Sequence, residues 1–399
     1  MDRSLRVRVT GPLAAYAPGF RAQLVACGYA PLSTARHLLV MARMSGWLES
    51  RGLDAGALTS QQVGQFLRAD RERGHWFPQS SRGLVPLLTY LRGVGAVPPE
   101  QAAVLSEAEQ LLAQFGTYLA SERGLRAATI VGYVHAARLF LDALGHGHNL
   151  EHLTPVDVRQ FLLAECERRS VGSAKRVVSG LRAWLRFLHV EGVTSRSLSG
   201  SVPAVAGWGD SGMPRAIDTA SVQALVNSCD RRTGKGRRDV AVLLLMSRLG
   251  LRVGEVATLA LADVDWRGGQ ISVRGKANRA DRLPLPIDVG QALADYVQYG
   301  RPCADRRELF LQVLAPHRAL TAAAAKMIVH RACARAGVPA LGAHRLRHTV
   351  ASELLRHGAG LPEIGQVLRH HSLASTAIYA KADRAALRQL ARPWPGGAA

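Results

Sequence analysis

His344-Arg345-Leu346-Arg347-His348-Thr349 is the stretch of sequence that decides the fold of the C-terminal half. It is predicted to begin a helix, on which His344, Arg347 and His348 share one face because they are three and four residues apart. Two histidines on one face can bind zinc, but no Glu between them and no nearby carboxylate completes a ligand set. We therefore predict that no metal binds here.

A second motif lies downstream of the first. Leu368-Arg369-His370-His371-Ser372 is followed by Thr376-Ala377-Ile378-Tyr379, with nine residues from His370 to Tyr379. Taken alone, Tyr379 is most simply a packed core aromatic whose hydroxyl finds a hydrogen-bond partner. The two adjacent histidines are also ordinary taken alone, so any functional meaning depends on the other motifs.

Two further motifs lie upstream. Gly250-Leu251-Arg252-Val253-Gly254-Glu255 places an arginine and a glutamate three residues apart after a helix end, which in isolation indicates a surface ion pair. Lys276 directly follows Gly275 in a predicted hairpin turn, where a lysine usually serves only solubility.

The sequence around these motifs predicts an α+β domain. Short strands are expected at 264–266, 270–274 and 282–285, and form one small sheet among helices. The expected helices are 219–229, 237–249, 288–299, 321–336, 344–357, 361–369 and 373–378. The whole chain is therefore predicted to be mainly α-helical with a small β-sheet.

The order of these motifs resembles that of the phage-integrase or tyrosine-recombinase family. The resemblance covers residues 215–392 and, less strongly, 105–195. The family uses an arginine, a hairpin lysine, a His-x-x-Arg motif, a second histidine and a tyrosine, which correspond here to Arg252, Lys276, His344, Arg347, His370 and Tyr379. Arg369 departs from the family, which usually has glycine there. His371 competes with His370, and the nine-residue spacing to the tyrosine favours His370.

The resemblance implies that Tyr379 attacks a DNA phosphodiester and forms a 3′-phosphotyrosyl bond. Arginine guanidiniums neutralise the phosphate, the histidines donate further hydrogen bonds, and Lys276 protonates the leaving 5′-oxygen. Glu255 and His348 are expected to orient the arginine and the histidine without touching substrate. The phosphotyrosyl bond conserves the energy of the diester, so we expect neither a metal nor ATP nor any other cofactor.

An internal repeat appears in the N-terminal half at an offset of 95 residues. Leu58-Thr59-x-x-x-Val63-x-Gln65-Phe66-Leu67 matches Leu153-Thr154-x-x-x-Val158-x-Gln160-Phe161-Leu162, although any two amphipathic bundles align in part. We predict a helical bundle at 1–100, which either duplicates the core-binding domain or only resembles it. A SAM-like helical core-binding domain at 101–195, a linker at 196–214 and the catalytic domain at 215–399 follow.

The charge of the chain indicates a polyanionic partner. Lys and Arg number 51 against 30 Asp and Glu, a net charge of +21. A GC-rich genome explains arginine over lysine but not the scarcity of acids, so double-stranded DNA is the predicted partner. Candidate phosphate contacts in the helical domains are Arg168, Arg169, Lys175, Arg176, Arg182 and Arg186, although each alone is more often only a solvated charge.

Five scattered cysteines indicate neither a disulfide framework nor a zinc knuckle. No membrane span or signal peptide is predicted, and we expect a cytoplasmic protein that joins the nucleoid when bound to DNA. The resemblance further implies a homotetramer on paired sites, with or without a second recombinase, and we expect a mobile-element integrase. Two alternatives remain: a type IB topoisomerase-like nicking enzyme, and a catalytically inert DNA-binding accessory factor.

Overall fold

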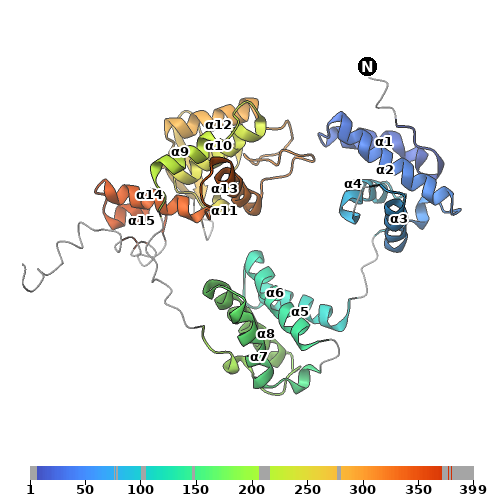
Figure 1. Cartoon of the computed structure of the whole chain (residues 1–399), viewed down its shortest axis with the longest axis horizontal. Helices are drawn as coiled ribbons and strands as arrows, with labels where there is room; N and C mark the ends of the chain where they lie inside the picture. Colours follow the sequence, from blue (N-terminus) through green and yellow to red (C-terminus); the bar gives the residue numbers. More distant parts are fainter. Residues whose placement is uncertain are drawn as a thin grey trace, which may run out of the picture. The chain divides into compact units, whose positions relative to one another are not determined.

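The computed structural model describes residues 7–75, 77, 80–99, 105–145, 149–205, 216–275, 280–370, 376 and 379. Contacts between Cα atoms divide the chain into two compact units, residues 101–209 and residues 1–100 together with 210–399. Helices dominate both units, and the strands of the described residues form one small sheet (Figure 1). The predicted fold class, mainly α-helical with a small sheet, is confirmed.

The unit of residues 101–209 is a four-helix bundle. Its helices are α5 (Glu107–Ser121), α6 (Ala127–Leu144), α7 (Pro155–Glu167) and α8 (Val171–Val190). Thr154 caps α7, because its Oγ1 accepts from the amide of Asp157 while the Asp157 carboxylate accepts from the amide of Thr154. Aromatic rings fill the centre, where Phe115 lies edge-on to Trp184 at 5.1 Å between ring centroids.

Helix α6 is the one helix, among the described residues, that is long and apolar enough to cross a membrane by length and composition. It nevertheless carries Arg138 and Asp142, and its Ala136, Ala137 and Phe140 pack in the core of the bundle. Helix α6 contacts α5, α7 and α8, so its apolar face packs against the other helices of the bundle.

Residues 7–99 form a second group of helices with its own core. The elements are η2 (Gly11–Tyr16), α1 (Ala17–Ala26), α2 (Pro31–Glu49), η3 (Ala55–Ala57), α3 (Ser60–Glu72) and α4 (Ser81–Gly93). The core is apolar and includes Phe20, Trp47 and Phe66, while the buried carboxylate of Asp70 is paired with Arg43 at 2.9 Å. Burial of this acid is tolerated because a guanidinium compensates its charge.

The C-terminal part contains the sheet and a helical layer. Its helices are α9 (Thr219–Asn227), α10 (Gly234–Arg248), α11 (Val253–Thr258), α12 (Ile287–Tyr299), α13 (Ala322–Ala336), α14 (His344–Arg356) and α15 (Leu361–Val367). Strands β1 (Val264–Asp265), β2 (Gln270–Arg274) and β3 (Ala280–Pro284) are antiparallel in the order β1-β2-β3, with Ile271 opposite Leu283. The predicted helix at 373–378 lies outside the described residues except at Thr376.

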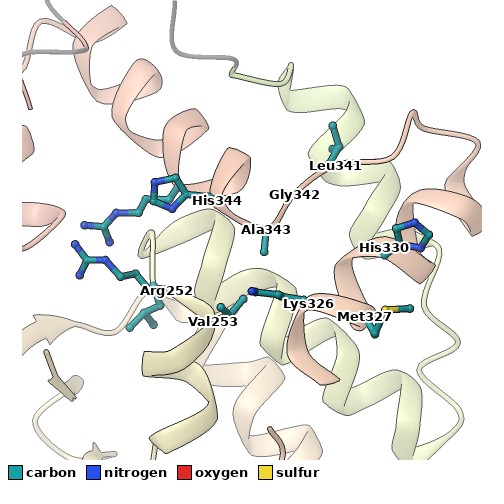
Figure 2. A pocket seen from close by; sticks show the side chains of 11 residues that line it. Arg252, Val253, Lys326, Met327, His330, Leu341, Gly342, Ala343 and His344 are labelled. Carbon is teal, nitrogen blue, oxygen red and sulfur yellow. The ribbon is translucent and has the colours of Figure 1, made fainter. Parts of the chain in front are cut away.

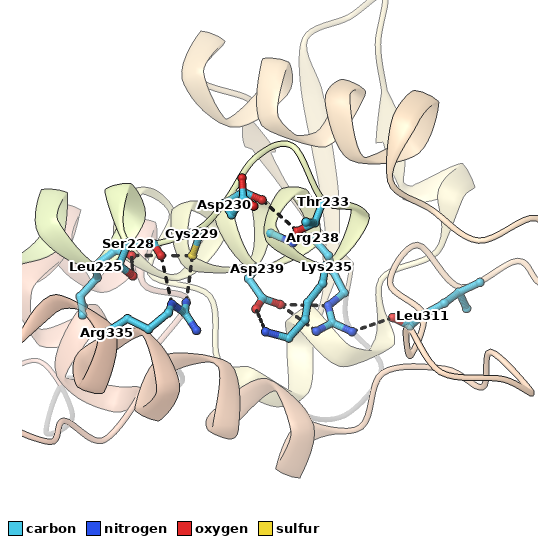
Figure 3. Close-up of polar contacts among 11 residues, drawn as sticks. Leu225, Ser228, Cys229, Asp230, Thr233, Lys235, Arg238, Asp239, Leu311 and Arg335 are labelled. Carbon is cyan, nitrogen blue, oxygen red and sulfur yellow. Dashed lines mark hydrogen bonds and ion pairs between the residues drawn. The ribbon is translucent and has the colours of Figure 1, made fainter. Parts of the chain in front are cut away.

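Helix α10 is the centre of the C-terminal core and is buried from Arg238 to Met246. Its polar start is held by Asp239, which is 1% exposed and accepts from the guanidinium of Arg238 at 2.7 Å. The same guanidinium donates to the carbonyl of Leu311 at 3.1 Å, and Lys235 lies 3.5 Å from the carboxylate (Figure 3). This buried pair ties the helix to a distant loop.

The segment predicted as a linker begins inside the helical bundle. Leu198 and Val202 are buried in the core of that unit, and Arg182 donates from Nη2 to the carbonyl of Val202 at 2.9 Å. These two apolar residues fix the start of the predicted linker on the bundle. Residues 206–214 lie outside the described residues.

Candidate active site

Arg252 is positioned by the start of helix α11. Helix α10 ends at Arg248, Gly250 adopts a left-handed φ of 60°, and the chain re-enters a helix with Arg252 as its N-cap. Glu255, the third residue of α11, accepts from the amide of Arg252 at 2.8 Å. The sequence predicted an ion pair between Arg252 and Glu255 after a helix end. In the structure the two residues form the N-terminal cap of α11, a short helix that the sequence did not predict.

The same carboxylate holds the side chain of Arg252. Nη1 of Arg252 donates to Oε1 of Glu255 at 2.7 Å, a contact through which Glu255 could orient the arginine. Burial would raise the pKa of Glu255, but the amide of Arg252 and the positive charges of Arg369 and Arg252 outweigh it and lower that pKa. Glu255 is therefore an ionised, buried anchor beneath a partly exposed arginine.

Arg347 is the most deeply buried charge of the site, with 1% of its surface exposed. It donates from Nη1 to the carbonyl of Gly250 at 2.5 Å and from Nη2 to the carbonyl of Leu368, whereas its Nε has no hydrogen-bond partner. Burial, together with the charges of Arg252 and Arg369, lowers the pKa of Arg347 to about 10, so it remains cationic at neutral pH. Its fixed guanidinium ties α14 to the turn before Arg252.

Arg252, His344 and Arg347 line one pocket of about 550 Å³. Figure 2 shows Arg252 and His344 side by side at one end of it, with Lys326, Met327 and His330 of α13 along the other side. Burial, followed by the charges of the two arginines, lowers the pKa of His344, which favours the neutral imidazole. The wall of the pocket thus carries a histidine and two arginines, of which Arg252 is partly exposed and Arg347 is almost fully buried.

Tyr379 lies against two histidines. Its Oη is 2.8 Å from Nδ1 of His348, and its ring is parallel to that of His370 with 6.4 Å between centroids. Burial raises the pKa of Tyr379 more than the charge of Arg347 lowers it, so the phenol is protonated at neutral pH. His348 was expected to act on the arginine and histidine of the site. The structure places it on the tyrosine hydroxyl as well as against the ring of His344.

His370 lies three residues after the end of α15. Its Nδ1 lies 2.7 Å from Oγ1 of Thr376, which leaves Nε2 for another partner. Burial and the charges of Arg347 and Arg252 lower the pKa of His370 to about 4, so the ring is neutral at pH 7. If the hydroxyl of Thr376 donates to Nδ1, the proton of the neutral ring is on Nε2, where it can be donated to an anion.

Arg369 explains why the family usually has glycine at this position. Its φ is 54°, in the left-handed region that glycine adopts without strain. The guanidinium of Arg369 turns inward, is 8% exposed as a residue, and donates to Oε2 of Glu255 at 2.8 Å. The consequence of this departure is a third arginine within the site.

The structure therefore gathers most of the predicted residues in one place. Arg252, His344 and Arg347 share the pocket. Tyr379 is connected to it through His348, which contacts both Tyr379 and His344, and the ring of His370 is parallel to that of Tyr379. Lys276 and His371 lie outside the described residues.

Comparisons with known proteins identify the family of the chain. The model described as phage integrase family matches residues 215–385, and that of the phage integrase N-terminal SAM-like domain matches residues 112–192. The integrase/recombinase y4rA of Sinorhizobium fredii is 40% identical over 395 residues, covering 97% of this chain and 96% of the relative. The chain belongs to the phage integrase, or tyrosine recombinase, family.

Other relatives extend the comparison. Tyrosine recombinase XerC of Oceanobacillus iheyensis is 31% identical over 301 residues, covering 71% of this chain and 95% of the relative. The fold is shared with XerH site-specific recombinase bound to its palindromic difH substrate, with a TM-score of 0.55 at 19% identity, covering 70% of this chain and 83% of that one. A lambda integrase dimer bound to a COC′ core site gives a TM-score of 0.54 at 16% identity, covering 79% of this chain and 89% of that one. The prediction of a DNA strand-breaking and rejoining recombinase is confirmed.

The candidate DNA contacts of this recombinase differ in their surroundings. Arg169 pairs with Glu165 at 2.5 Å, and Arg182 donates to a carbonyl of its own unit, so both have structural partners. Arg176 donates to Ser173 at 2.9 Å and is exposed. Arg168 and Arg186 are exposed, and Lys175 is half-buried. Four of the arginines are therefore exposed, Arg168, Arg176, Arg182 and Arg186, and of these Arg176 and Arg182 donate within their own unit.

Sequence reasoning missed three residues of the recombinase site. Lys326 lines the pocket from α13, Thr376 holds the second histidine, and Arg369 holds Glu255. Only Arg369 left a signal, because it stands where the family usually has glycine. An exposed lysine on a helix and a threonine before the tyrosine carry no signal that a single sequence could reveal.

Proposed function

We propose that Tyr379 of this recombinase is the nucleophile, and that Arg252, His344, Arg347 and His370 bind the phosphate it attacks. The observation that carries the proposal is the meeting of two guanidiniums and His344 in one pocket, next to a tyrosine hydroxyl held by a histidine. A phosphodiester repels an incoming oxygen until its charge is neutralised, and preorganised donors do this at low reorganisation cost.

The proton of the tyrosine has an acceptor in the structure. Oη of Tyr379 can donate to Nδ1 of His348, whose pKa is lowered by burial and by the charges of His344 and Arg347. A neutral His348 is a hydrogen-bond acceptor, so we infer that it takes the phenolic proton as the Oη–P bond forms. This role replaces the purely orienting one that the sequence suggested for it.

Cleavage then expels the deoxyribose 5′-oxygen. The bond from phosphorus to that oxygen breaks, the 3′-phosphate stays on Tyr379, and Lys276 supplies the proton that makes the 5′-hydroxyl. Rejoining is the reverse, with the 5′-hydroxyl of a partner strand attacking the phosphotyrosine. The residues assigned here do this without a metal, ATP or another cofactor.

Residues 7–99 are proposed to be a second copy of the core-binding bundle. Shifted by 95 residues, α3 (Ser60–Glu72) falls on α7 (Pro155–Glu167) and η3 (Ala55–Ala57) falls on η4 (Leu150–His152). Buried residues coincide under the same shift, as Phe20 with Phe115, Val63 with Val158 and Phe66 with Phe161. Amphipathic bundles align in part by chance, but coincident helix ends, a short 3-10 turn and buried positions together favour duplication.

Charge supports a role for this second copy on DNA. Residues 1–100 contain 12 Arg against 6 Asp and Glu, a net charge of +6, while residues 101–209 contain 11 Arg and Lys against 9 acids, a net charge of +2. Arg68 and Arg73 are exposed on and beside α3. We expect replacing both with Glu in the full chain to weaken duplex binding and to lower its salt slope by about 2. An unchanged slope measured by fluorescence anisotropy would contradict this role.

The biological role is proposed at the level of the family. XerH and a lambda integrase dimer were captured on DNA, which supports the proposal that this chain binds double-stranded DNA. Membership of the family extends the proposal to a homotetramer on paired sites, with or without a second recombinase. Its proposed place is the cytoplasm, on the nucleoid, as the integrase of a mobile element.

Strand exchange between two labelled duplexes that carry the ends of its own element tests this function. The recombinase is expected to join the label of one duplex to the other without metal or ATP. Cleavage and resealing within one duplex only would indicate the topoisomerase-like alternative. Binding without any cleavage would indicate an accessory factor.

A further inference from the structure

Arg369 occupies a strained position in the site. It is one of two non-glycine residues with positive φ among the described residues, at 54°, and it lies between Leu368, whose carbonyl accepts from Arg347, and His370. A long side chain in the left-handed region is unfavourable, and persists only where the surroundings determine it. Because the backbone conformation is unfavourable for arginine, the strain indicates that the contacts of the Arg369 side chain compensate for it.

The side chain of Arg369 meets a carboxylate that already serves Arg252. Oε2 of Glu255 accepts from Nη2 of Arg369 at 2.8 Å and from the amide of Arg252 at 2.8 Å, while Oε1 accepts from the guanidinium of Arg252 at 2.7 Å. The side chains of Arg369 and Glu255 are 5% and 6% exposed, whereas that of Arg252 is 37% exposed. The inner pair is thus buried, and Arg252 is its exposed third member.

We propose that Arg369 is a positioning residue that stays on Glu255 as its counter-ion and so frees the guanidinium of Arg252 for the DNA phosphate. This inference rests on the proposed function of Arg252. A buried carboxylate whose only cation leaves it is strongly destabilised, so without Arg369 the glutamate would hold Arg252 back. With Arg369 in place, the guanidinium of Arg252 can leave Oε1 of Glu255 and donate to a phosphate oxygen instead. Oε2 of Glu255 then keeps its hydrogen bonds from Arg369 and from the amide of Arg252.

Charge leads to the same conclusion. The two arginines Arg252 and Arg347, together with the carboxylate of Glu255, carry a net charge of +1. Arg369 raises this net charge to +2 without facing the pocket. Arg369 does not line the pocket, so it acts on the phosphate through Glu255 and through its field. It is therefore a positioning residue and not a catalytic one.

The experiment measures the single-turnover rate of covalent adduct formation on a nicked suicide duplex, for the full chain and for variants that melt near the wild-type temperature. Arg369→Gly removes the charge and relaxes the backbone, and is expected to slow the adduct by about tenfold or more. Arg369→Lys keeps the charge and is expected to recover part of the rate. His317→Gly is the matched control, because it relaxes the other positive-φ residue, whose ring contacts Gln312 instead of the site.

A double-mutant cycle with Glu255→Gln separates positioning from general structural damage. If Arg369 neutralises Glu255, removing the carboxylate charge in the Arg369→Gly background costs less than in the wild type, or partly restores the rate. The proposal is overturned if Arg369→Gly forms the adduct at the wild-type rate. It is also overturned if the rate loss of the double variant equals the product of the rate losses of Arg369→Gly and Glu255→Gln. Failure of the wild-type chain to form any adduct would instead contradict the proposed function.

Discussion

Tyr379 and His348 set the reactivity of the site at the scale of single residues. The tyrosine is 1% exposed and its pKa is raised by burial, so it needs both a proton acceptor and an outward movement before its oxygen reaches a phosphate. His348 is that acceptor at 2.8 Å. Arg347 donates to main-chain carbonyls on both sides of the site, which fixes its guanidinium without any help from substrate.

His348→Phe is expected to slow adduct formation by about a hundredfold, because general base catalysis contributes roughly 10²–10⁴. Single-turnover cleavage of a nicked duplex gives the rate. His357→Phe is the matched control, since His357 is exposed and its Nδ1 contacts only the carbonyl of Glu353. Equal rates in the two variants would show that the contact between His348 and Tyr379 does not serve catalysis.

The histidines also predict how stability depends on pH. The pKa of His370 is lowered to about 4, and those of His344 and His348 are lowered as well, so the unfolded chain binds more protons than the native one between pH 4 and about 6.5. The melting temperature is expected to fall as pH decreases through this window. The decrease in melting temperature over this pH range should be smaller in His370→Gln than in the wild type. A dependence as steep in the variant as in the wild type would contradict the assignment.

At the scale of elements, the turn before α11 joins the two arginines. Gly250 has a φ of 60°, its carbonyl accepts from Arg347, and a Cβ built on it would lie 2.7 Å from Leu368. The turn therefore depends on glycine for its conformation and for its close approach to the end of α15.

Gly250→Ala is expected to lower the free energy of unfolding by about 1–3 kcal/mol and to slow cleavage, because strain and a clash displace the anchor of Arg347. Gly254→Ala is the control, as a Cβ there meets nothing within 4 Å and the position is helical. Chemical denaturation with a parallel cleavage assay gives both quantities. Equal stability of the two variants would refute the importance of the turn.

Sequence alone predicted most of these elements and could not predict others, for physical reasons. Periodicity and caps located α13 and α14 to within a residue or two, and the strands paired as expected. The short helix α11 was missed because six residues show no periodicity. The bond between His348 and Tyr379, and the inward turn of Arg369, depend on how α14 and α15 pack, which spacing along the chain does not encode.

At the scale of the whole molecule, the net charge of +21 dominates encounters with DNA. Affinity for a non-cognate duplex is expected to fall by about a thousandfold or more between roughly 50 and 200 mM salt, as for proteins that contact about six or more phosphates. Anisotropy titrations at several salt concentrations measure the slope. A nearly flat dependence would show that the basic residues are not phosphate contacts.

A covalent adduct between Tyr379 and DNA would identify the nucleophile. The full chain is incubated with labelled nicked duplex from its own element ends, without metal or ATP, and SDS-resistant complexes are counted. We expect an adduct in the wild type and none in Tyr379→Phe. An adduct that persists in that variant would contradict the assignment of the nucleophile.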